Sequence, residues 1–350
     1  MSTLLTLLQP LLSERINLSH RKFLVQVIQA ILLAWSVNII KLACEIPSHA
    51  TVNSVVRRIE RLLLIKFIRI DRLSSTIVSA LKQKGPYVLT MDGTSWRLGK
   101  RRYYILAVGI CFDGISLPIC FRSLPGNTSS CFIDEIELME HVISVLRTES
   151  IKCLVADREF GNTNFIRWLK SMHINFCIRL KGNFYVTGPD RKNSRTLNEV
   201  FQPLRIGQTA VLRRAYLIRK GVLVRIYCKR VRHRNAEDSL LILASPKGFD
   251  CTSRLYRLRW SIETAFRGWK TAGFNLEQTH LDEDRFENML VLMSIAYAAA
   301  FIDGWVKITS IPIPIMKKNG RKRLSILRYG LTDSIHRFWA NVNFTPTWPS

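Results

Sequence analysis

Apolar residues in the first quarter of the chain recur at spacings of three and four positions, with few turn-forming residues between them. This periodicity is typical of amphipathic helices, so we predict that residues 1–82 form a helical N-terminal domain. Either Ser48 or Thr51 is placed to cap a helix through residues 55–63, because each supplies a side-chain oxygen just before the apolar periodicity resumes.

The pattern changes after Gly85-Pro86 to short apolar runs separated by turn residues. The order of these runs resembles that of a ribonuclease H-like core, in which helices cover the faces of a mixed sheet. We therefore expect an α/β fold, with the first part of the core in residues 83–182. Strands are predicted at 87–91, 103–112, 115–121, 152–156 and 176–180, and helices at 133–147 and 164–172.

Residues 183–247 are mostly strand-like, with runs at 209–217 and 222–230 flanking Lys220-Gly221 and a further run at 239–244. This region is predicted to be a β-rich insertion within the ribonuclease H-like fold. Helical periodicity returns at Ser253 and continues past Lys270, and a second long helix is predicted across 285–302. We assign 248–303 to the second part of the core and 304–350 to a basic C-terminal segment of the helical C-terminal part.

The charge of the chain is strongly positive, with 52 Lys and Arg against 26 Asp and Glu in 350 residues, a formal net charge of +26. Such an excess disfavours an ordinary metabolic enzyme and favours a polyanionic partner, with nucleic acid first and an anionic membrane surface second. The excess is uneven: residues 160–262 hold 21 basic and 5 acidic side chains, whereas residues 92–159 hold 8 and 9. Arg57, Arg58 and Arg61 share one side of their predicted helix, either as a DNA-binding surface or as the solvated face of a helical bundle.

Two apolar segments, 23–44 and 289–302, need consideration as membrane spans. The first contains polar residues and the second is shorter than the roughly 20 residues of a span, so both are expected to be buried helices, and no membrane partner is expected. The start of the chain lacks the basic region of a signal peptide. The eight cysteines form no CxxC pair and are interpreted as dispersed thiols, without a zinc site, in a reducing cytosol.

Two aspartates end strand-like runs. Asp92 follows 87–91 and Asp157 follows 152–156, and in a sheet with parallel neighbours such ends lie a few ångströms apart. Two close carboxylates favour a shared cation, and hard oxygen ligands suit Mg²⁺ or Mn²⁺. Two such ions together support phosphoryl transfer. The alternatives are that Asp92-Gly93 is a simple turn and that Asp157 caps the next helix.

A third element has the spacing Y-x2-R-x3-E-x6-K. On a continuous helix its four positions fall within an arc of roughly 60°, so that a phenol, a guanidinium, a carboxylate and an ammonium share one face. The carboxylate would complete a metal site and the cations would bind phosphates. The alternative is an exposed helix stabilised by i,i+4 pairs. The four residues are Tyr256, Arg259, Glu263 and Lys270.

With these motifs the sequence resembles the DDE transposases of the insertion-sequence-four family, whose signature is this Y-R-E-K spacing. Residues 90–94 (TMDGT), 156–161 (ADREFG) and 273–281 (GFNLEQTHL) resemble three further stretches of that family. The resemblance implies that Asp92, Asp157 and Glu263 are the catalytic triad and bind the metal ions. It also implies that Tyr256, Arg259 and Lys270 contact DNA, and that the β-rich insertion lies between the second Asp and the Glu.

The activity so implied is cut-and-paste transposition: metal-dependent cleavage of the ends of an insertion sequence, followed by strand transfer. The partners implied are double-stranded DNA, as element ends and target, and a second copy of the chain on paired ends, with the protein in the cytoplasm on the nucleoid. Two alternatives remain, a structure-selective metal-dependent nuclease on the same core and a catalytically inactive DNA-binding derivative.

Expectations also follow for several residues outside these motifs. Glu159 is expected to be an exposed carboxylate at a helix start rather than a further acid at the metals. Trp260 is expected to pack in the core. The basic residues of 317–323 are either a phosphate-contacting loop or a solvated tail. The acidic residues of the helix after the third strand are expected on its solvated side: Asp134, Glu135, Glu137 and Glu140.

Overall fold

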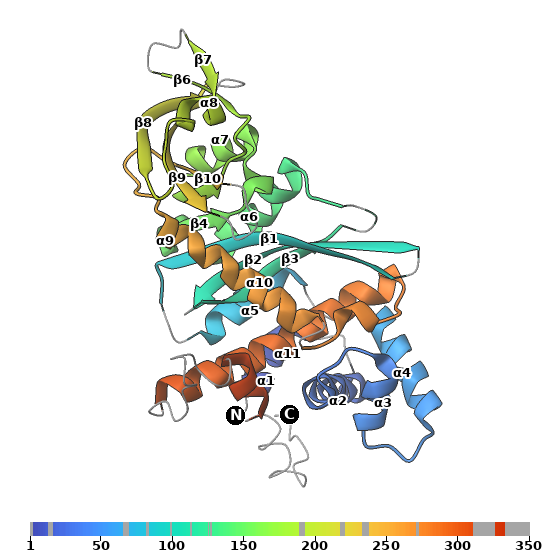
Figure 1. The fold of residues 1–350 in the computed structure, drawn as a ribbon. Coiled ribbons are helices and arrows are strands. Elements are labelled where there is room, and N and C mark those ends of the chain that lie inside the picture. The colour runs from blue at the N-terminus through green and yellow to red at the C-terminus, as the bar shows by residue number, and fades with distance from the viewer. Residues whose placement is uncertain are drawn as a thin grey trace, which may run out of the picture.

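The computed structural model describes residues 3–12, 17–65, 70–81, 84–98, 100–112, 114–124, 126, 128–188, 193–217, 221–232, 238–270, 273–310 and 326–332. In Figure 1 the strands β1–β3 cross the middle of the molecule, the strands β6–β10 lie above them, and the helices α1–α4 lie below. The architecture is α/β, with one large mixed sheet and helices packed against it.

The central strands are β1 (Tyr87–Leu98), β2 (Arg101–Phe112), β3 (Ile115–Ser123), β4 (Ile151–Ala156) and β5 (Phe176–Arg179). They are ordered β3-β2-β1-β4-β5. The first three form an antiparallel meander, and β4 and β5 continue the sheet in parallel with β1. This order is compatible with the expected ribonuclease H-like core. Strands are present at all five predicted positions, but β1 continues to Leu98, beyond the predicted 87–91. Gly114, between β2 and β3, has φ +81°, a backbone conformation that favours glycine in a hairpin turn; Asp113 lies outside the described residues.

The strands of the predicted insertion extend this same sheet. They are β6 (Tyr185–Thr187), β7 (Ser194–Thr196), β8 (Thr209–Leu217), β9 (Val222–Arg232) and β10 (Asp238–Ser245), and α8 (Leu197–Phe201) lies among them. The sheet continues from β5 in the order β10-β9-β8-β6-β7. The strand β10 pairs with β5 through Leu243↔Arg179 and Ala244↔Ile178, so the β-rich region is attached to the core by backbone hydrogen bonds.

Helices cover the sheet because their apolar faces need a partner. The helix α6 (Phe132–Leu146) packs on β2 and β3, α7 (Thr163–Ser171) packs against α6 and β9, and α10 (Trp260–Trp269) packs on β1 and β3. In Figure 1 α10 crosses in front of the central strands.

The N-terminal region is helical in its described parts, with α1 (Thr3–Leu8), α2 (Leu18–Ala34), α3 (Ile39–Glu45), α4 (Val52–Leu64) and α5 (Ile70–Ala80), and a 3-10 turn η1 (Gln9–Leu11). Thr51 caps α4, its side chain accepting a hydrogen bond from the Ser54 N–H, and so one of the two predicted caps is confirmed. The helices α1, α2 and α4 pack on α11, and α5 packs on β3 and α6.

The long helix α11 (Glu283–Ser310) packs against both the N-terminal helices and the strand β3 of the sheet. It is long and apolar enough to cross a membrane, but 83% of its most apolar stretch is buried inside the fold. Its apolar residues therefore serve as core, as expected for 289–302. The pair α2 and α3, which covers most of 23–44, bends by 104° at the break between the helices.

Candidate functional site

Two aspartates from neighbouring parallel strands lie side by side on the sheet. The register pairs Met91 of β1 with Ala156 of β4, so Asp92 and Asp157 occupy the next position on the same face. Asp157 directly follows β4, as predicted. The expectation that Asp92 ends its strand is wrong, because β1 continues to Leu98 and stays paired with β2 throughout.

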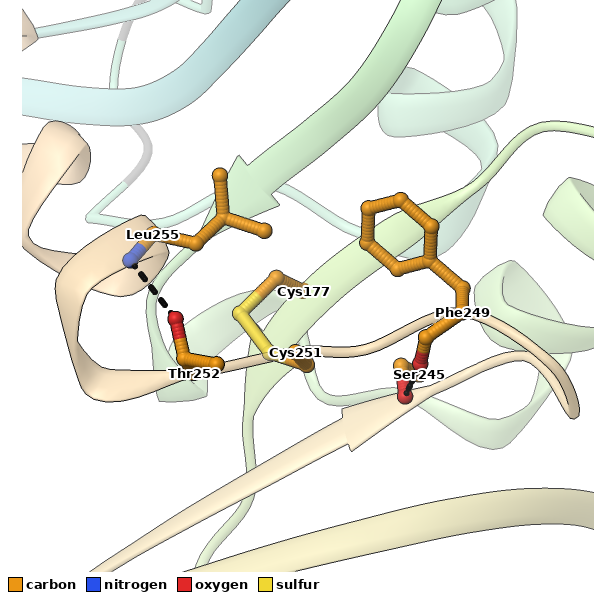
Figure 2. Close-up of a disulfide and its surroundings, with 6 residues drawn as sticks. All are labelled: Cys177, Ser245, Phe249, Cys251, Thr252 and Leu255. Atoms are coloured by element: carbon orange, nitrogen blue, oxygen red, sulfur yellow. Dashed lines mark hydrogen bonds between the residues drawn. A yellow bond between two sulfur atoms is a disulfide. The ribbon is translucent and has the colours of Figure 1, made fainter.

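The signature residues lie on a helical segment that starts beside these aspartates. It comprises α9 (Ser253–Tyr256), a 3-10 turn η4 (Arg257–Arg259) and then α10. Thr252 caps α9 by accepting a hydrogen bond from the Leu255 N–H, and a disulfide ties the preceding residue, Cys251, to Cys177 of β5 (Figure 2). The interpretation of all cysteines as dispersed thiols is therefore wrong for this pair. The disulfide and the cap together fix where the segment begins relative to β5.

Tyr256 and Arg259 connect this segment to the carboxylates. The Tyr256 hydroxyl donates to Asp157 Oδ1 at 2.7 Å. The Arg259 guanidinium donates through Nη1 to Asp92 Oδ2 at 3.0 Å and contacts Glu263 Oε1 through Nη2 at 2.7 Å. The i,i+4 pair of the alternative interpretation is thus present, but the Arg259 side chain is only 8% exposed. Three carboxylates, a phenol and a guanidinium therefore form one cluster.

Lys270 lies apart from this cluster. The helix ends at Trp269, and Lys270 has non-helical backbone angles of φ −94° and ψ −143°. Its ammonium donates to the Ser95 backbone oxygen at 3.0 Å and lies 3.6 Å from Glu277. The expectation of one continuous helical face with four functional groups is therefore wrong for its last member. Beyond the helix end, Gly273 lies so close to Gly268 that a side chain on it has no room, and the Phe274 N–H donates to the Gly268 backbone oxygen at 2.9 Å.

The aspartates differ in electrostatic environment. Burial raises the pKa of Asp92 to about 6, although the Arg259 guanidinium and the Gly93 N–H oppose the rise. Burial also acts to raise the pKa of Asp157, but hydrogen bonds from Tyr256 and Arg158 and the nearby Arg259 and Arg179 outweigh it, so this pKa is lowered. Burial and donation to Asp157 raise the pKa of the Tyr256 phenol, which therefore stays protonated as a donor. One aspartate is thus held firmly ionised and the other is poised to take up a proton.

The donor chemistry suits a hard divalent cation, but the arrangement does not. Among the described residues, no group of three or more His, Cys, Asp or Glu side chains is placed to hold a metal ion. Arg259 accounts for this, since its guanidinium lies between Asp92 and Glu263. The residues as placed here therefore do not fit a bound divalent ion.

A second polar group, which sequence patterns did not reveal, lies beside Asp92. The Tyr104 hydroxyl of β2 occupies the place where a side chain on Gly93 would be and donates to Glu159 Oε1 at 3.1 Å. Glu159 is two residues after Asp157, so this bond links β2, which pairs with the strand that carries Asp92, to the segment that follows Asp157. Glu159 itself is exposed and lies in the 3-10 turn η3 (Arg158–Phe160) after β4, which confirms the expectation of an exposed carboxylate at a helix start.

Glu135 corrects another expectation. It is only 2% exposed, and its Oε1 accepts from the Ser130 hydroxyl at 3.3 Å. Burial raises its pKa to about 8, with Glu159 and Asp134 adding to the effect and Ser130 opposing it. Glu135 shares the buried face of α6 with Leu138, Met139 and Val142, and this helical spacing was the signal that placed it inside. Glu137 and Glu140 are exposed as expected, whereas Asp134 is partly buried and accepts from the Cys131 N–H.

Trp260 is 55% exposed, so the expectation of core packing is wrong. That expectation assumed a continuous α-helix, but the preceding residues form a 3-10 turn with about three residues per turn, which changes the direction of each side chain. The indole ring lies 4.9 Å from the guanidinium carbon of Arg259. An exposed aromatic surface therefore adjoins the carboxylate cluster.

The remaining predicted cations lie elsewhere. Arg57, Arg58 and Arg61 are exposed on α4, and the Arg58 guanidinium lies over the Phe23 ring at 3.8 Å. The basic residues of 317–323 lie outside the described residues.

Comparison with known proteins shows the family to which the chain belongs. The model of the transposase DDE domain family matches residues 83–299, well over half of the chain. No curated protein matches. Among solved structures, the crystal structure of an endonuclease V from Bacillus subtilis aligns at 13% identity over 61% of this chain and 84% of that one, with a TM-score of 0.27, too low to support any argument. The matched residues contain the carboxylate cluster and its tyrosine and arginine partners.

Proposed function

Because the chain belongs to the transposase DDE domain family, we propose that it is a DNA transposase that cleaves the ends of an insertion sequence and joins them to a target. The observation that carries the proposal is the cluster itself. Three carboxylates from separate parts of the matched region meet, and Tyr256 and Arg259 hold them in place. In this proposal Asp92, Asp157 and Glu263 are the catalytic residues.

The proposed chemistry is two successive in-line displacements at phosphorus. In the first, water attacks a phosphodiester at the element end and the 3′ oxygen leaves as a hydroxyl. In the second, that 3′-hydroxyl attacks a phosphodiester of the target, a new phosphodiester bond forms, and the target's own 3′ oxygen leaves as a hydroxyl. The family generally uses divalent metals, so the cofactor of the proposal is Mg²⁺ or Mn²⁺, two ions. The three carboxylates would hold these ions only in an arrangement in which Arg259 no longer lies between Asp92 and Glu263. Asp157, held ionised by Tyr256 and its cationic neighbours, supplies a constant negative charge to this site.

The finer assignment is to the insertion-sequence-four family with cut-and-paste transposition. The sequence Y-x2-R-x3-E-x6-K and the strands β6–β10 between Asp157 and Glu263 support it. Residues 83–182 and 248–303 would form a ribonuclease H-like core and residues 183–247 its insertion. Lys270 would contact DNA from a position beside β1, near Ser95.

The proposed partners are double-stranded DNA and a second copy of the chain on paired ends, in the cytoplasm on the nucleoid. Residues 1–82 would bind the element ends, with Arg57, Arg58 and Arg61 on the exposed face of α4. Part of the basic insertion, residues 183–247, and the basic residues of 317–323 would add phosphate contacts.

The test is cleavage of the element's own end in Mg²⁺. Asp92→Ala or Glu263→Ala is expected to abolish cleavage while binding of the same DNA is retained, and Glu140→Ala, which changes an exposed carboxylate of α6, is expected to cleave normally. Cleavage that survives both site changes would refute the assignment. Incubating a pre-nicked end with target DNA then separates a transposase, which yields joined products, from a nuclease, which yields only cuts; an inactive derivative would yield neither.

A further inference from the structure

We propose that Tyr104 is a positioning residue: its hydroxyl holds the turn η3, and with it Asp157, in place beside Asp92. The inference rests on the proposed function, because the reaction whose rate it concerns is the cleavage of DNA. It starts from two residues of the sequence motifs that the proposed chemistry leaves without a role, Gly93 and Glu159.

The backbone pairing between β1 and β4 ends directly before the two aspartates. Met91 and Ala156 are the last residues of these strands in register. Beyond them β1 stays paired with β2, whereas the chain that follows β4 enters η3. The hydrogen bonds of the sheet therefore fix the backbone at Asp92 but do not extend to Asp157, so side-chain contacts are needed to hold the second aspartate against the first.

Tyr104 supplies such a contact from the face of the sheet opposite Asp92. Successive side chains of a strand point to opposite faces, so the face at Gly93 is not the face of Asp92. The Tyr104 hydroxyl lies where a side chain on Gly93 would be and donates to Glu159 Oε1 at 3.1 Å. The side chain of Tyr104 thus reaches from β2 across β1 to η3, and the absence of a side chain on Gly93 makes this possible.

The Tyr104–Glu159 hydrogen bond reaches Asp157 through a single short turn. Glu159 is the middle residue of η3, and the Phe160 N–H of this turn donates to the Asp157 backbone oxygen at 3.1 Å. Tyr104 is only 3% exposed, so surrounding atoms restrict its ring. Burial and the charge of Glu159 raise the pKa of the phenol, although hydrogen bonding by Ser130 opposes the rise, and the hydroxyl stays protonated as a donor. A displacement of Glu159 is therefore passed on to Asp157.

The first test compares two hydroxyls on adjacent residues of β2. Tyr104→Phe removes the donor to Glu159, and the control Tyr103→Phe removes an equally buried hydroxyl that donates to the Leu281 backbone oxygen at 3.0 Å. Tyr104→Phe is expected to lower the single-turnover rate of DNA cleavage about 10-fold, because small displacements of reacting groups slow a reaction steeply. The DNA concentration at half-maximal rate is expected to stay unchanged, since a residue so buried does not contact DNA. Tyr103→Phe is expected to change neither quantity.

The second test concerns the acceptor. Glu159→Gln keeps an oxygen that accepts from Tyr104 and is expected to cleave within about 2-fold of the rate of the unchanged protein. Glu159→Leu, which has no acceptor, is expected to be about as slow as Tyr104→Phe. The double variant Tyr104→Phe/Glu159→Leu is expected to be no slower than either single variant, because both changes remove the same bond. Additive losses, or equal rates for Glu159→Gln and Glu159→Leu, would overturn the inference.

The position of η3 is also measured without any activity, by hydrogen exchange. In Tyr104→Phe the Phe160 N–H is expected to exchange about 2- to 10-fold faster than in Tyr103→Phe, as the loss of one hydrogen bond predicts. If Tyr104→Phe is too unstable for these measurements, Glu159→Leu is compared with Glu159→Gln instead, since Glu159 is exposed.

Cleavage or exchange that is equally fast in Tyr104→Phe and Tyr103→Phe would overturn the inference. That failure is distinct from failure of the proposed function. If Asp92→Ala abolishes cleavage while the two tyrosine variants behave alike, the transposase assignment stands and the positioning role does not. If the unchanged protein does not cleave the element's end, but the Phe160 N–H exchanges faster in Tyr104→Phe alone, the proposed function fails and the hold of Tyr104 on η3 stands.

Discussion

The helix α4 and the turn η4 both carry arginines in short helical segments, but the two sets have opposite surroundings. Arg57, Arg58 and Arg61 on α4 are exposed. Arg259 at the end of η4 is buried between carboxylates, with its side chain 8% exposed. The sequence gives both segments the same chemical groups at similar spacing. The sheet beneath η4, which brings Asp92 against Arg259, accounts for the difference.

The comparison shows that the contribution of a charged side chain to stability depends on its burial. Exposed cations are screened by water and salt and contribute little to stability, but they remain available to phosphates. A buried ion pair costs desolvation when it forms, yet removing one partner leaves the other charge uncompensated. Changes at the two sites should therefore separate stability from DNA affinity.

The largest expected effect is on the stability of Arg259→Gln. Loss of the guanidinium leaves Asp92 and Glu263 without their shared cation, and the free energy of unfolding is expected to fall by about 3–5 kcal/mol. Urea unfolding followed by tryptophan fluorescence measures this. Arg57→Gln is the matched change on α4 and is expected to stay within about 0.5 kcal/mol of the unchanged protein. If the free energy of unfolding falls equally in Arg259→Gln and Arg57→Gln, burial does not distinguish the arginine of η4 from that of α4.

A second, smaller effect concerns the pH dependence of stability at Glu135. Its pKa of about 8 in the folded protein lies above its ordinary value of 4.5, so the folded state binds a proton that the unfolded state has released. Stability is therefore expected to fall as pH rises from about 4.5 to about 8. Glu135→Gln mimics the protonated form, and its stability at pH 8 is expected to exceed that of the unchanged protein by roughly 2–4 kcal/mol.

The control for this change is Glu137→Gln, which alters an exposed carboxylate of the same helix. Unfolding curves recorded between pH 5 and pH 8 give the free energy of unfolding of Glu135→Gln and of the unchanged protein. The two free energies are expected to converge toward pH 5. A constant difference across the range would show that the carboxyl does not titrate in this way.

The smallest effect on stability is expected for the combined change of Arg57, Arg58 and Arg61 to Gln. The three exposed side chains should matter mainly for DNA. If each contacts one phosphate, the slope of log K against log salt becomes shallower by about 2.7. Titration of DNA binding at several salt concentrations measures this, and an unchanged slope would place the DNA contacts of the protein elsewhere than on α4.

Local patterns in the sequence were enough to locate β1–β5, β8–β10, α6 and α7, and to predict that Asp92 and Asp157 meet. Apolar runs predicted β1–β5 because a strand with both faces covered must be apolar throughout. Asp92 and Asp157 follow runs of similar length in neighbouring parallel strands, so they were expected to lie side by side. The cap at Thr51 was also predicted, because a cap depends only on residues a few positions away.

Other features depend on contacts between distant segments. Asp92 lies within β1 rather than at its end because β2 pairs with the strand beyond it. Tyr104 reaches Glu159 only because Gly93, in the adjacent strand, has no side chain. The disulfide joins residues 74 positions apart, a pairing that spacing does not predict.

The sequence itself thus determined which residues form the cluster, through the two aspartates that follow its apolar runs and through its Y-x2-R-x3-E spacing. Only the tertiary structure decided how they are used: Tyr256 on Asp157, Arg259 between Asp92 and Glu263, Lys270 beyond the helix end and Trp260 toward solvent. The physical reason is that helical spacing gives the direction of a side chain only while the helix is regular. The 3-10 turn before Trp260 and the end of the helix at Trp269 changed those directions, and the opposing sheet decided which charges became buried partners.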